Sequence, residues 1–358
     1  RSLSASGSPT ASVEPAMIAM KRKLASVVTV GQVSPIAGAD RIEVARVAGW
    51  QCVVKKGEVT PGELAVYLEI DSVPPDTETF AWLWQPKSAT ARVPRPETFR
   101  IRTLRLRGTL SQGLVLPLAQ LGLSDVKPGD DLTERLGITR YEPPAPSGMG
   151  DYRAPFPSIV PKTDELRVQS FPAVLDELRG KPFVATVKMD GTSVTFVRVE
   201  GELHVCGRNH SIAEGENLYW YVAKKHRVAE CLEAHPTLAL QGEVVGPGIQ
   251  KNPAGLKDKT LFVFSAYDWQ AGRFLTDGEL RALCARHGLT PVPVAFEGAS
   301  FDETVESLLL RAEGLYPGTS NQREGVVVRP KEELRSDVLG GRLSFKAISN
   351  RYLLDERD

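Results

Sequence analysis

A lysine and an aspartate two positions apart, Lys188 and Asp190, lie between two segments with the composition of β-strands. The mostly apolar run 182–187 precedes them, and the largely β-branched run 192–197 follows. Residues two apart in an extended chain share one face, so Lys188 and Asp190 are expected to point into the same space while Met189 packs behind them. The pattern predicts a fold that places a lysine and a carboxylate together at the end of a strand.

Such a lysine can act as a nucleophile only if its amine loses a proton. An unperturbed lysine has a pKa of about 10.4 and is almost wholly protonated at neutral pH. Burial or neighbouring cations lower that pKa. We therefore expect the rest of the chain to supply such a setting around Lys188.

The composition limits the class of protein. With 358 residues, 42% hydrophobic and 25% charged, the chain is long enough for two globular domains. Lys+Arg and Asp+Glu both number 44, so a nucleic-acid surface would require local segregation of charge. The four isolated cysteines argue against a zinc site or a disulfide framework and favour a reducing, cytoplasmic setting. No apolar run approaches the length of a membrane span, so no membrane partner is expected.

Changes in composition divide the chain into four segments. Residues 1–22, rich in Ser, Ala and Pro, are expected to be a disordered tail or a cloning remnant. Short β-rich runs between Pro, Gly and Asp clusters predict a small OB-like β-barrel over 23–141. Residues 142–150 have the Pro and Gly content of a linker. Residues 151–358 alternate strands with helical stretches, one of them 217–234, which predicts a second domain of the α+β class.

A cluster of arginines lies within the first of these domains and includes Arg100, Arg102, Arg105 and Arg107. If 98–106 form one strand, the first two share a face and the last two share the opposite face. Two interpretations are equally supported. The arginines could track the phosphates of a nucleic-acid strand, or they could keep a solvated edge strand from aggregating.

Further charged residues stand at the ends of predicted strands in the second domain: Arg208, Glu243, Glu324 and Lys346. Together with Lys188 and Asp190 they make a set of two lysines, three acids and an arginine. This set suits phosphoryl or nucleotidyl transfer, in which cations neutralise phosphate oxygens and carboxylates hold a hydrated divalent metal. No dinucleotide-binding fingerprint, P-loop or paired histidine is present to support another chemistry.

The order and spacing of these residues resemble the motifs of the covalent nucleotidyltransferases, the superfamily of polynucleotide ligases and mRNA capping enzymes. The resemblance extends over about residues 162–354 and includes the aromatic strand 261–264. DNA ligases and capping enzymes carry an OB domain after the last lysine motif, whereas this chain ends 12 residues beyond Lys346 and has its β domain first. That arrangement, with the closing sequence 344–354, resembles the Deinococcus-type RNA ligases. It implies an OB-like barrel followed by an adenylyltransferase domain of antiparallel sheets flanked by helices.

The resemblance implies an ATP-dependent RNA ligase. Lys188 would attack the α-phosphorus of ATP, form a lysyl-AMP and expel pyrophosphate; the AMP would pass to a 5′-phosphate, and a 3′-hydroxyl would displace it. The implied cofactors are ATP and Mg or Mn, the implied partners are RNA ends within a nicked duplex, and a monomer is expected. The alternatives are a DNA ligase, a capping-type guanylyltransferase, or a non-catalytic nucleic-acid-binding protein with a decayed ligase domain.

The same resemblance implies roles for individual residues. The nucleotide would be contacted by Arg167, Thr186 and Arg208. Phe264 would stack on adenine, unless Phe262, on the same face of that strand, takes its place.

The resemblance also implies a metal site and a second cationic group. The carboxylates that would hold a metal through its water are Asp190, Glu243 and Glu324, of which Glu243 would contact either the metal's water or the ribose hydroxyl of the nucleotide. Lys346 would engage the α-phosphate and, together with the metal, lower the pKa of Lys188. Many relatives have lysines two apart in the final motif. Here the earlier of those positions is Ser344, so only Lys346 can take the cationic role.

Overall fold

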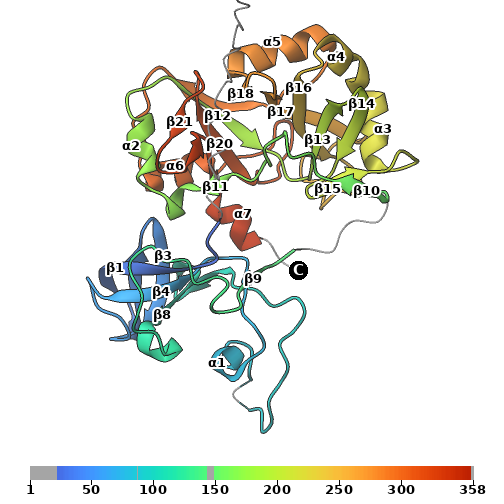
Figure 1. Cartoon of the computed structure of the whole chain (residues 1–358). Coiled ribbons are helices and arrows are strands. Elements are labelled where there is room, and N and C mark those ends of the chain that lie inside the picture. Colours follow the sequence, from blue (N-terminus) through green and yellow to red (C-terminus); the bar gives the residue numbers. More distant parts are fainter. Residues whose placement is uncertain (1–21, 87, 143–148, 356–358) are drawn as a thin grey trace, which may run out of the picture.

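The computed structural model describes residues 22–86, 88–142 and 149–355 and has two lobes (Figure 1). The N-terminal lobe comprises 22–142 and the C-terminal lobe 149–355. Most of the expected tail and most of the expected linker lie outside the described residues, and the predicted domain boundaries stay predictions. None of the helices described is both long enough and apolar enough to cross a membrane.

The N-terminal lobe is built on one curved antiparallel sheet in the order β3-β2-β1-β4-β8. Its long first strand pairs with β4 through residues 25–29 and with β2 through residues 30–36, so it belongs to both halves of the barrel. The strands of this sheet are β1 (Ala25–Ile36), β2 (Ala39–Val47), β3 (Trp50–Lys55), β4 (Leu64–Leu68) and β8 (Leu114–Pro117). The additional elements are β5 (Ser72–Val73) paired with β9 (Thr139–Arg140), the hairpin β6 (Thr103–Leu106) and β7 (Thr109–Gln112), α1 (Glu78–Ala81) and η1 (Leu118–Leu121).

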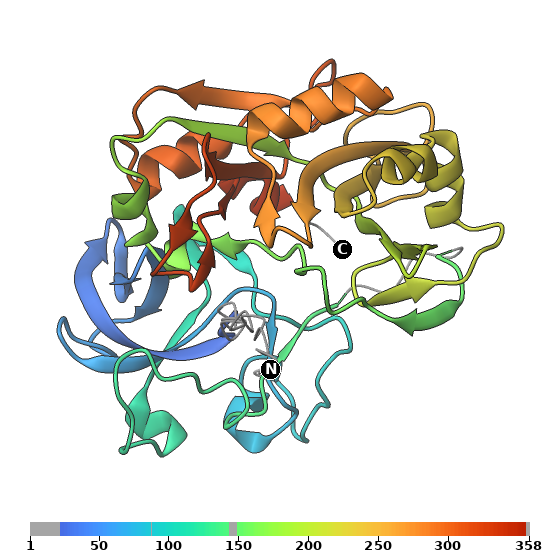
Figure 2. The ribbon, with the colours of Figure 1, turned by 45° about the horizontal axis from the view of Figure 1, so that its top comes forward.

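The C-terminal lobe contains two sheets whose inner faces meet (Figure 2). A seven-stranded antiparallel sheet has β10 (Tyr152–Pro155), β15 (His210–Ile212), β14 (Glu202–Cys206), β13 (Thr192–Val199), β16 (Leu238–Val245), β17 (Thr260–Asp268) and β18 (Arg273–Phe274), in that order. A five-stranded sheet has β11 (Leu166–Arg167), β23 (Phe345–Ile348), β20 (Gly325–Pro330), β12 (Phe183–Lys188) and β19 (Val294–Gly298). The short pair β21 (Arg335–Ser336) and β22 (Gly341–Arg342) stands apart.

Helices cover the outer faces of both sheets. The seven-stranded sheet shares one apolar core with α3 (Leu218–Lys225), α4 (Val228–Ala234) and α5 (Asp277–His287). The five-stranded sheet shares another with η2 (Val168–Ser170), α2 (Val174–Leu178) and α6 (Val305–Ala312). With their outer faces buried in this way, the strands present their alternate residues to the space between the sheets. The predicted α+β class and the N-terminal β-barrel are confirmed.

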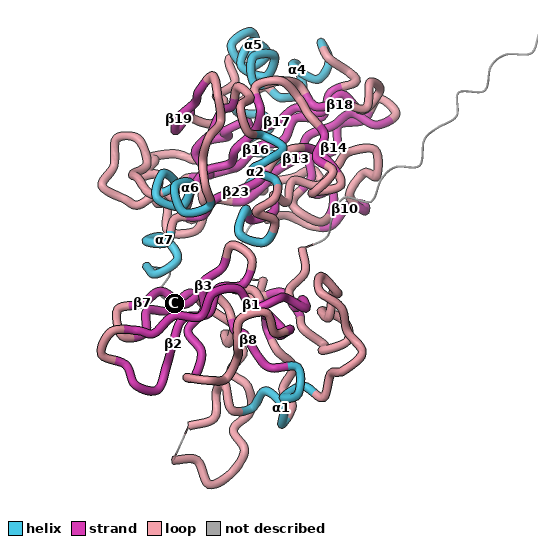
Figure 3. Tube along the Cα trace, turned by 90° about the vertical axis from the view of Figure 1, so that its left-hand side faces the viewer, coloured by secondary structure: helices cyan, strands magenta, loops and turns pink. Residues whose placement is uncertain are grey.

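The C-terminal helix α7 (Asn350–Asp355) joins the two lobes (Figure 3). Leu353 of this helix belongs to the same apolar cluster as Trp50 and other core residues of the N-terminal lobe. The Gly49 N–H donates to the Gln169 carbonyl of the C-terminal lobe at 2.9 Å. A Cβ at Gly49 would lie 2.7 Å from Gln169 Cα, so the close approach of the lobes requires glycine there. The lobes are therefore packed directly against each other.

Candidate active site

Strand register brings the predicted lysines to one face of the five-stranded sheet. Lys188, at the end of β12, pairs with Gly325 of β20, and Lys346 of β23 pairs with Val327 of β20. Phe183 and Ala185 point into the outer core, so Thr186 and Lys188, in alternation with them, face the seven-stranded sheet. The local pattern of Lys188 at a strand end is as the sequence predicts.

Lys188 is surrounded by carboxylates. Its Nζ lies 2.7 Å from Glu324 Oε2, and Glu324 directly precedes β20. Burial acts to lower the pKa of Lys188, but the charges of Glu324, Glu243 and Asp190 outweigh it and raise that pKa above its ordinary value. Without a metal the acids therefore outweigh Lys346, and the expected net lowering of the Lys188 pKa does not arise from the protein's own residues.

The acids crowd one another. Glu243, on the inner face of β16, has its pKa raised to about 8 by burial and by the charges of Glu324 and Asp190, against the opposing effect of Lys188. Three carboxylates around one ammonium leave an excess of negative charge that a divalent cation would neutralise. Among the described residues, no three His, Cys, Asp or Glu side chains lie together closely enough to hold an ion directly. The set fits an ion held through its water molecules.

Lys346 has the opposite surroundings. Burial and the positive charges of Lys188, Arg167 and Arg22 lower its pKa to about 7. Arg167 lies beside it, because β11 pairs with β23 in parallel and places Arg167 opposite Lys346. Lys346 is thus the cation at this site whose charge changes near neutral pH, as that of Glu243 does among the acids.

The N-terminal lobe contributes charged residues to the same place. Asp71 Oδ2 lies 3.2 Å from Arg167 Nη2 and 3.5 Å from Arg22 Nη2. Glu69 Oε1 lies 2.9 Å from Arg22 Nη2. Burial opposes ionisation of Asp71, but the arginines and Lys346 hold the pKa of its carboxyl below the ordinary value. Sequence patterns missed Glu69, Asp71 and Arg22, the last of which falls within the segment expected to be a tail; the only local signal is the basic run 21–23.

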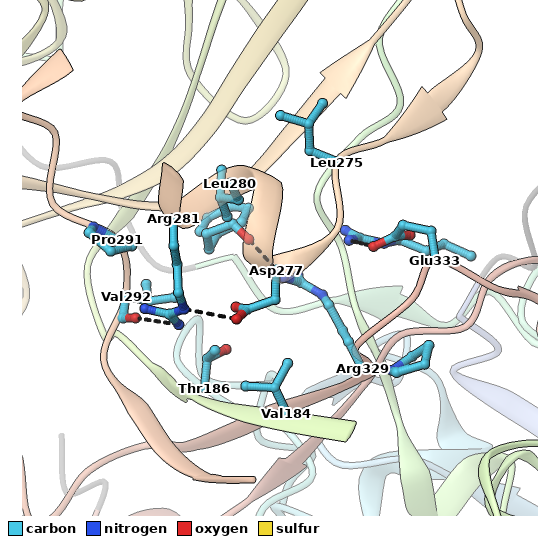
Figure 4. Close-up of a pocket in the computed structure, with 13 residues that line it drawn as sticks. Val184, Thr186, Leu275, Asp277, Leu280, Arg281, Pro291, Val292, Arg329 and Glu333 are labelled. Carbon is cyan, nitrogen blue, oxygen red and sulfur yellow. Dashed lines mark hydrogen bonds and ion pairs between the residues drawn. The ribbon is translucent and has the colours of Figure 1, made fainter. Parts of the chain in front are cut away.

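A pocket opens between the sheets next to Thr186 and is lined by Val184, Thr186, Phe264 and Arg329 among others (Figure 4). Arg329 was not singled out from the sequence. Its Nη1 donates to the Phe264 carbonyl at 2.7 Å, and its Nε donates to Ser344 Oγ at 2.8 Å. The Arg329 guanidinium places a cation beside Ser344, two residues before Lys346, and it ties the aromatic strand β17 to the five-stranded sheet.

Arg208 lies at the edge of the cleft. Its Nη2 is 2.6 Å from Asp164 Oδ1, and Arg140 of the N-terminal lobe is 3.7 Å from the other oxygen of that carboxylate. Burial opposes ionisation of Asp164, but Arg208, Arg140 and Lys346 hold its pKa below the ordinary value. Arg208 therefore belongs to the cationic side of the site, near Lys346.

The four arginines of the N-terminal lobe do not form one platform, because β6 begins only at Thr103. The Arg100 guanidinium packs over the Tyr141 ring at 4.2 Å and lies 3.7 Å from Asp71, so it belongs to the junction of the lobes. Arg105 and Arg107 are exposed on the β6–β7 hairpin, whereas Arg102 precedes it.

A partly buried lysine among carboxylates, between two antiparallel sheets and next to a β-barrel, is the architecture of a covalent nucleotidyltransferase. The RNA ligase family model matches residues 181–348, and an OB-fold domain model matches residues 24–118. No curated protein sequence matches the chain.

Solved structures of the RNA ligase of Naegleria gruberi are similar over nearly the whole chain. A lysine-to-methionine mutant with AMP and Mn and the enzyme with PPi are each 38% identical, with a TM-score of 0.83, covering 93% of this chain and 98% of theirs. A glutamate-to-alanine mutant with ATP and Mn is 37% identical with the same TM-score and coverage. The chain belongs to the RNA ligase family. The matches do not specify the Deinococcus type within it.

Proposed function

We propose that this RNA ligase joins a 5′-phosphate and a 3′-hydroxyl of RNA at the expense of ATP, with Lys188 as the nucleophile. The observation that carries the proposal is the Lys188 amine between Glu324 and the Lys346–Arg167 pair. Nζ would attack the α-phosphorus of ATP as the bond to pyrophosphate breaks and the amine loses its proton. An RNA 5′-phosphate oxygen would then take the AMP from Lys188, and a 3′-hydroxyl would displace AMP to form the phosphodiester.

The similar structures support the first of these steps. They contain ATP, AMP or PPi, which are the substrate and products of lysine adenylation. Two of them carry changes at a lysine and an aspartate two positions apart, the spacing of Lys188 and Asp190. In this chain Lys346, Arg167 and Arg208 would neutralise phosphate oxygens, because they form the cationic side of the cleft.

A site for the base of ATP is expected on the aromatic strand β17, beside Thr186. Phe264 lines the small pocket there, whereas Phe262 pairs with Glu243 across β16 and β17. We propose that adenine stacks on the Phe264 ring, with the edge of the adenine towards Thr186. Arg329 would keep the stacking ring in place through the Phe264 carbonyl.

The divalent metal named with the similar structures is Mn. Asp190, Glu243 and Glu324 would hold the hydrated ion in this chain. When bound, it supplies positive charge at the α-phosphate and offsets the carboxylates that keep Lys188 protonated.

Incubation of the purified protein with α-labelled ATP or GTP and Mg or Mn, followed by denaturing electrophoresis, tests the proposal. We expect label from ATP that survives denaturation and is transferred to a 5′-phosphate in a nicked RNA duplex. Label from GTP alone, or sealing of DNA nicks but not RNA nicks, would overturn it.

The RNA would approach along the N-terminal hairpin. β6 lies beside α7, and the hydroxyl of Tyr352 in α7 donates to Asp190 Oδ2 at 2.9 Å. The hairpin that carries Arg105 and Arg107 is therefore connected through α7 to Asp190, two residues from Lys188. We propose that these two arginines contact RNA phosphates, with a nicked duplex bound by a monomer.

A cytoplasmic location belongs to the same proposal and is supported by four unpaired cysteines.

Replacing Arg105 and Arg107 together by alanine is expected to weaken RNA binding about tenfold. The slope of log affinity against log salt concentration should become less steep by the amount that corresponds to about two phosphate contacts. The rate of lysine adenylation should not change, because neither side chain contacts the cleft. Arg135→Ala is the matched control, since Arg135 is exposed on the same lobe and paired with Asp125. Equal effects of the double variant and the control on RNA binding would refute the assignment.

A further inference from the structure

The ladder between β12 and β20 ends at the catalytic lysine. Thr186 pairs with Val327, and Lys188 pairs with Gly325. The next rung would join Met189 to Glu324, but the strands diverge there and the backbone groups need other partners. We call this point of divergence, at Met189 and Glu324, the fork. The functional side chains of Lys188 and Glu324 both lie there.

A single side-chain hydroxyl fills the fork. The Tyr316 hydroxyl donates to the Lys188 carbonyl at 3.2 Å and accepts from the Asp190 N–H at 3.1 Å and the Glu324 N–H at 3.3 Å. A tyrosine hydroxyl has one proton to donate and accepts readily through its lone pairs, so these three contacts satisfy it. A direct rung would hold N–H and C=O about 2.9 Å apart. The inserted oxygen instead holds the two strands further apart, at a set separation.

The tyrosine is itself rigidly held. It is 1% exposed and packs in one apolar cluster with Val187 and Met189, the residues on either side of Lys188. Its N–H donates to the Asn321 carbonyl at 3.0 Å, and Asn321 Nδ2 donates to the Pro253 carbonyl at 2.8 Å.

The loop that carries the tyrosine is also anchored at its other end. The Arg323 guanidinium donates to the carbonyls of Ala312 and Glu313 at 3.0 Å each, where α6 ends. The loop is therefore held by hydrogen bonds at both ends, which fixes the position of the hydroxyl.

We propose that Tyr316 is a positioning residue for lysine adenylation: its hydroxyl fixes the backbone of Lys188, Asp190 and Glu324 relative to one another, so that the amine and both carboxylates meet the α-phosphate together. The inference rests on the proposed function. Without the hydroxyl, three partly buried backbone groups lose their partner and the fork relaxes. Misplacement of a reacting group by about 1 Å can cost about 100-fold in rate.

The test is Tyr316→Phe, assayed for label from ATP in single-turnover reactions. We expect the adenylation rate at saturating ATP to fall about 10- to 100-fold while the ATP concentration for half-maximal rate changes less than about twofold, because the base and phosphate contacts remain. Tyr67→Phe is the matched control: Tyr67 is also a buried tyrosine, and its hydroxyl donates to the Gln112 carbonyl at 3.1 Å, in the N-terminal lobe.

Each outcome decides a separate point. Absence of label with the unaltered protein would refute the proposed function and not this inference alone. An unchanged rate in Tyr316→Phe, or an equal loss in both tyrosine variants, would overturn the positioning role. If circular dichroism shows that Tyr316→Phe is unfolded, Asn321→Ala decides, since it loosens the loop without removing the hydroxyl. We expect an approximately threefold lower rate with unchanged half-saturation; an unchanged rate would overturn the proposal.

Discussion

Lys188→Ala is expected to abolish transfer of AMP from ATP to the protein and, with it, the sealing of RNA from ATP. The reason is chemical: the lysyl-AMP forms only on the amine that faces both the carboxylates and the α-phosphate, and methyl has no electron pair to offer. Lys331→Ala is the control, because Lys331 lies directly after β20 but is only partly buried and is paired with Glu297. Its label should equal that of the unaltered protein.

The electrostatics of the site make this experiment informative. Lys346 has its pKa lowered to about 7, whereas the pKa of Lys188 is raised by its carboxylates, so Lys346 is the more readily neutralised amine in the protein without metal. Persistent label in Lys188→Ala, mapped to Lys346 by peptide mass spectrometry, would mean that the roles of the two lysines are exchanged. We expect label only at Lys188, because a metal held beside Asp190, Glu243 and Glu324 would reverse the balance of charge there.

Lys346→Ala is expected to slow adenylation about 100-fold or more while leaving Lys188 as the labelled residue. Removing one preorganised charge from a site that stabilises a transferring phosphoryl group typically costs about 100- to 1000-fold in rate. Single-turnover rates with α-labelled ATP measure the effect. A rate within about threefold of the unaltered protein would contradict a role for Lys346 at the phosphate.

The same lysine predicts a pH dependence of ATP binding. Because its pKa is about 7, Lys346 is mainly charged at pH 6 and mainly neutral at pH 8 in the unliganded protein. Affinity of the unaltered protein for a non-reacting α,β-methylene analogue of ATP should therefore fall as the pH rises through 7, by up to about tenfold. The Lys346→Ala variant should lose this component and retain only the titrations of the nucleotide and of Glu243, whose pKa is about 8. Equal pH dependence in both proteins would assign the titration elsewhere.

Local sequence pattern predicted the parts of the site that lie on strands. The alternation around Lys188 places its amine on one face of β12 and Met189 in a buried cluster, as expected. One local expectation was wrong in detail: 217–234 is not one helix, because Arg227 has a φ of 52° and separates α3 from α4. Helical composition did not reveal that break.

Sequence alone also determined the family-level arrangement, because catalytic groups at strand ends keep their order and spacing along the chain. Only the tertiary structure decided which groups surround them. Tyr316 meets Asp190 across 126 residues, Arg167 meets Asp71 across 96, and Arg329 meets Phe264 across 65. Such contacts depend on how sheets and lobes pack, and no local period in the sequence encodes that packing. The pKa values of Lys188 and Lys346 follow from it, because each depends on charges brought from distant segments.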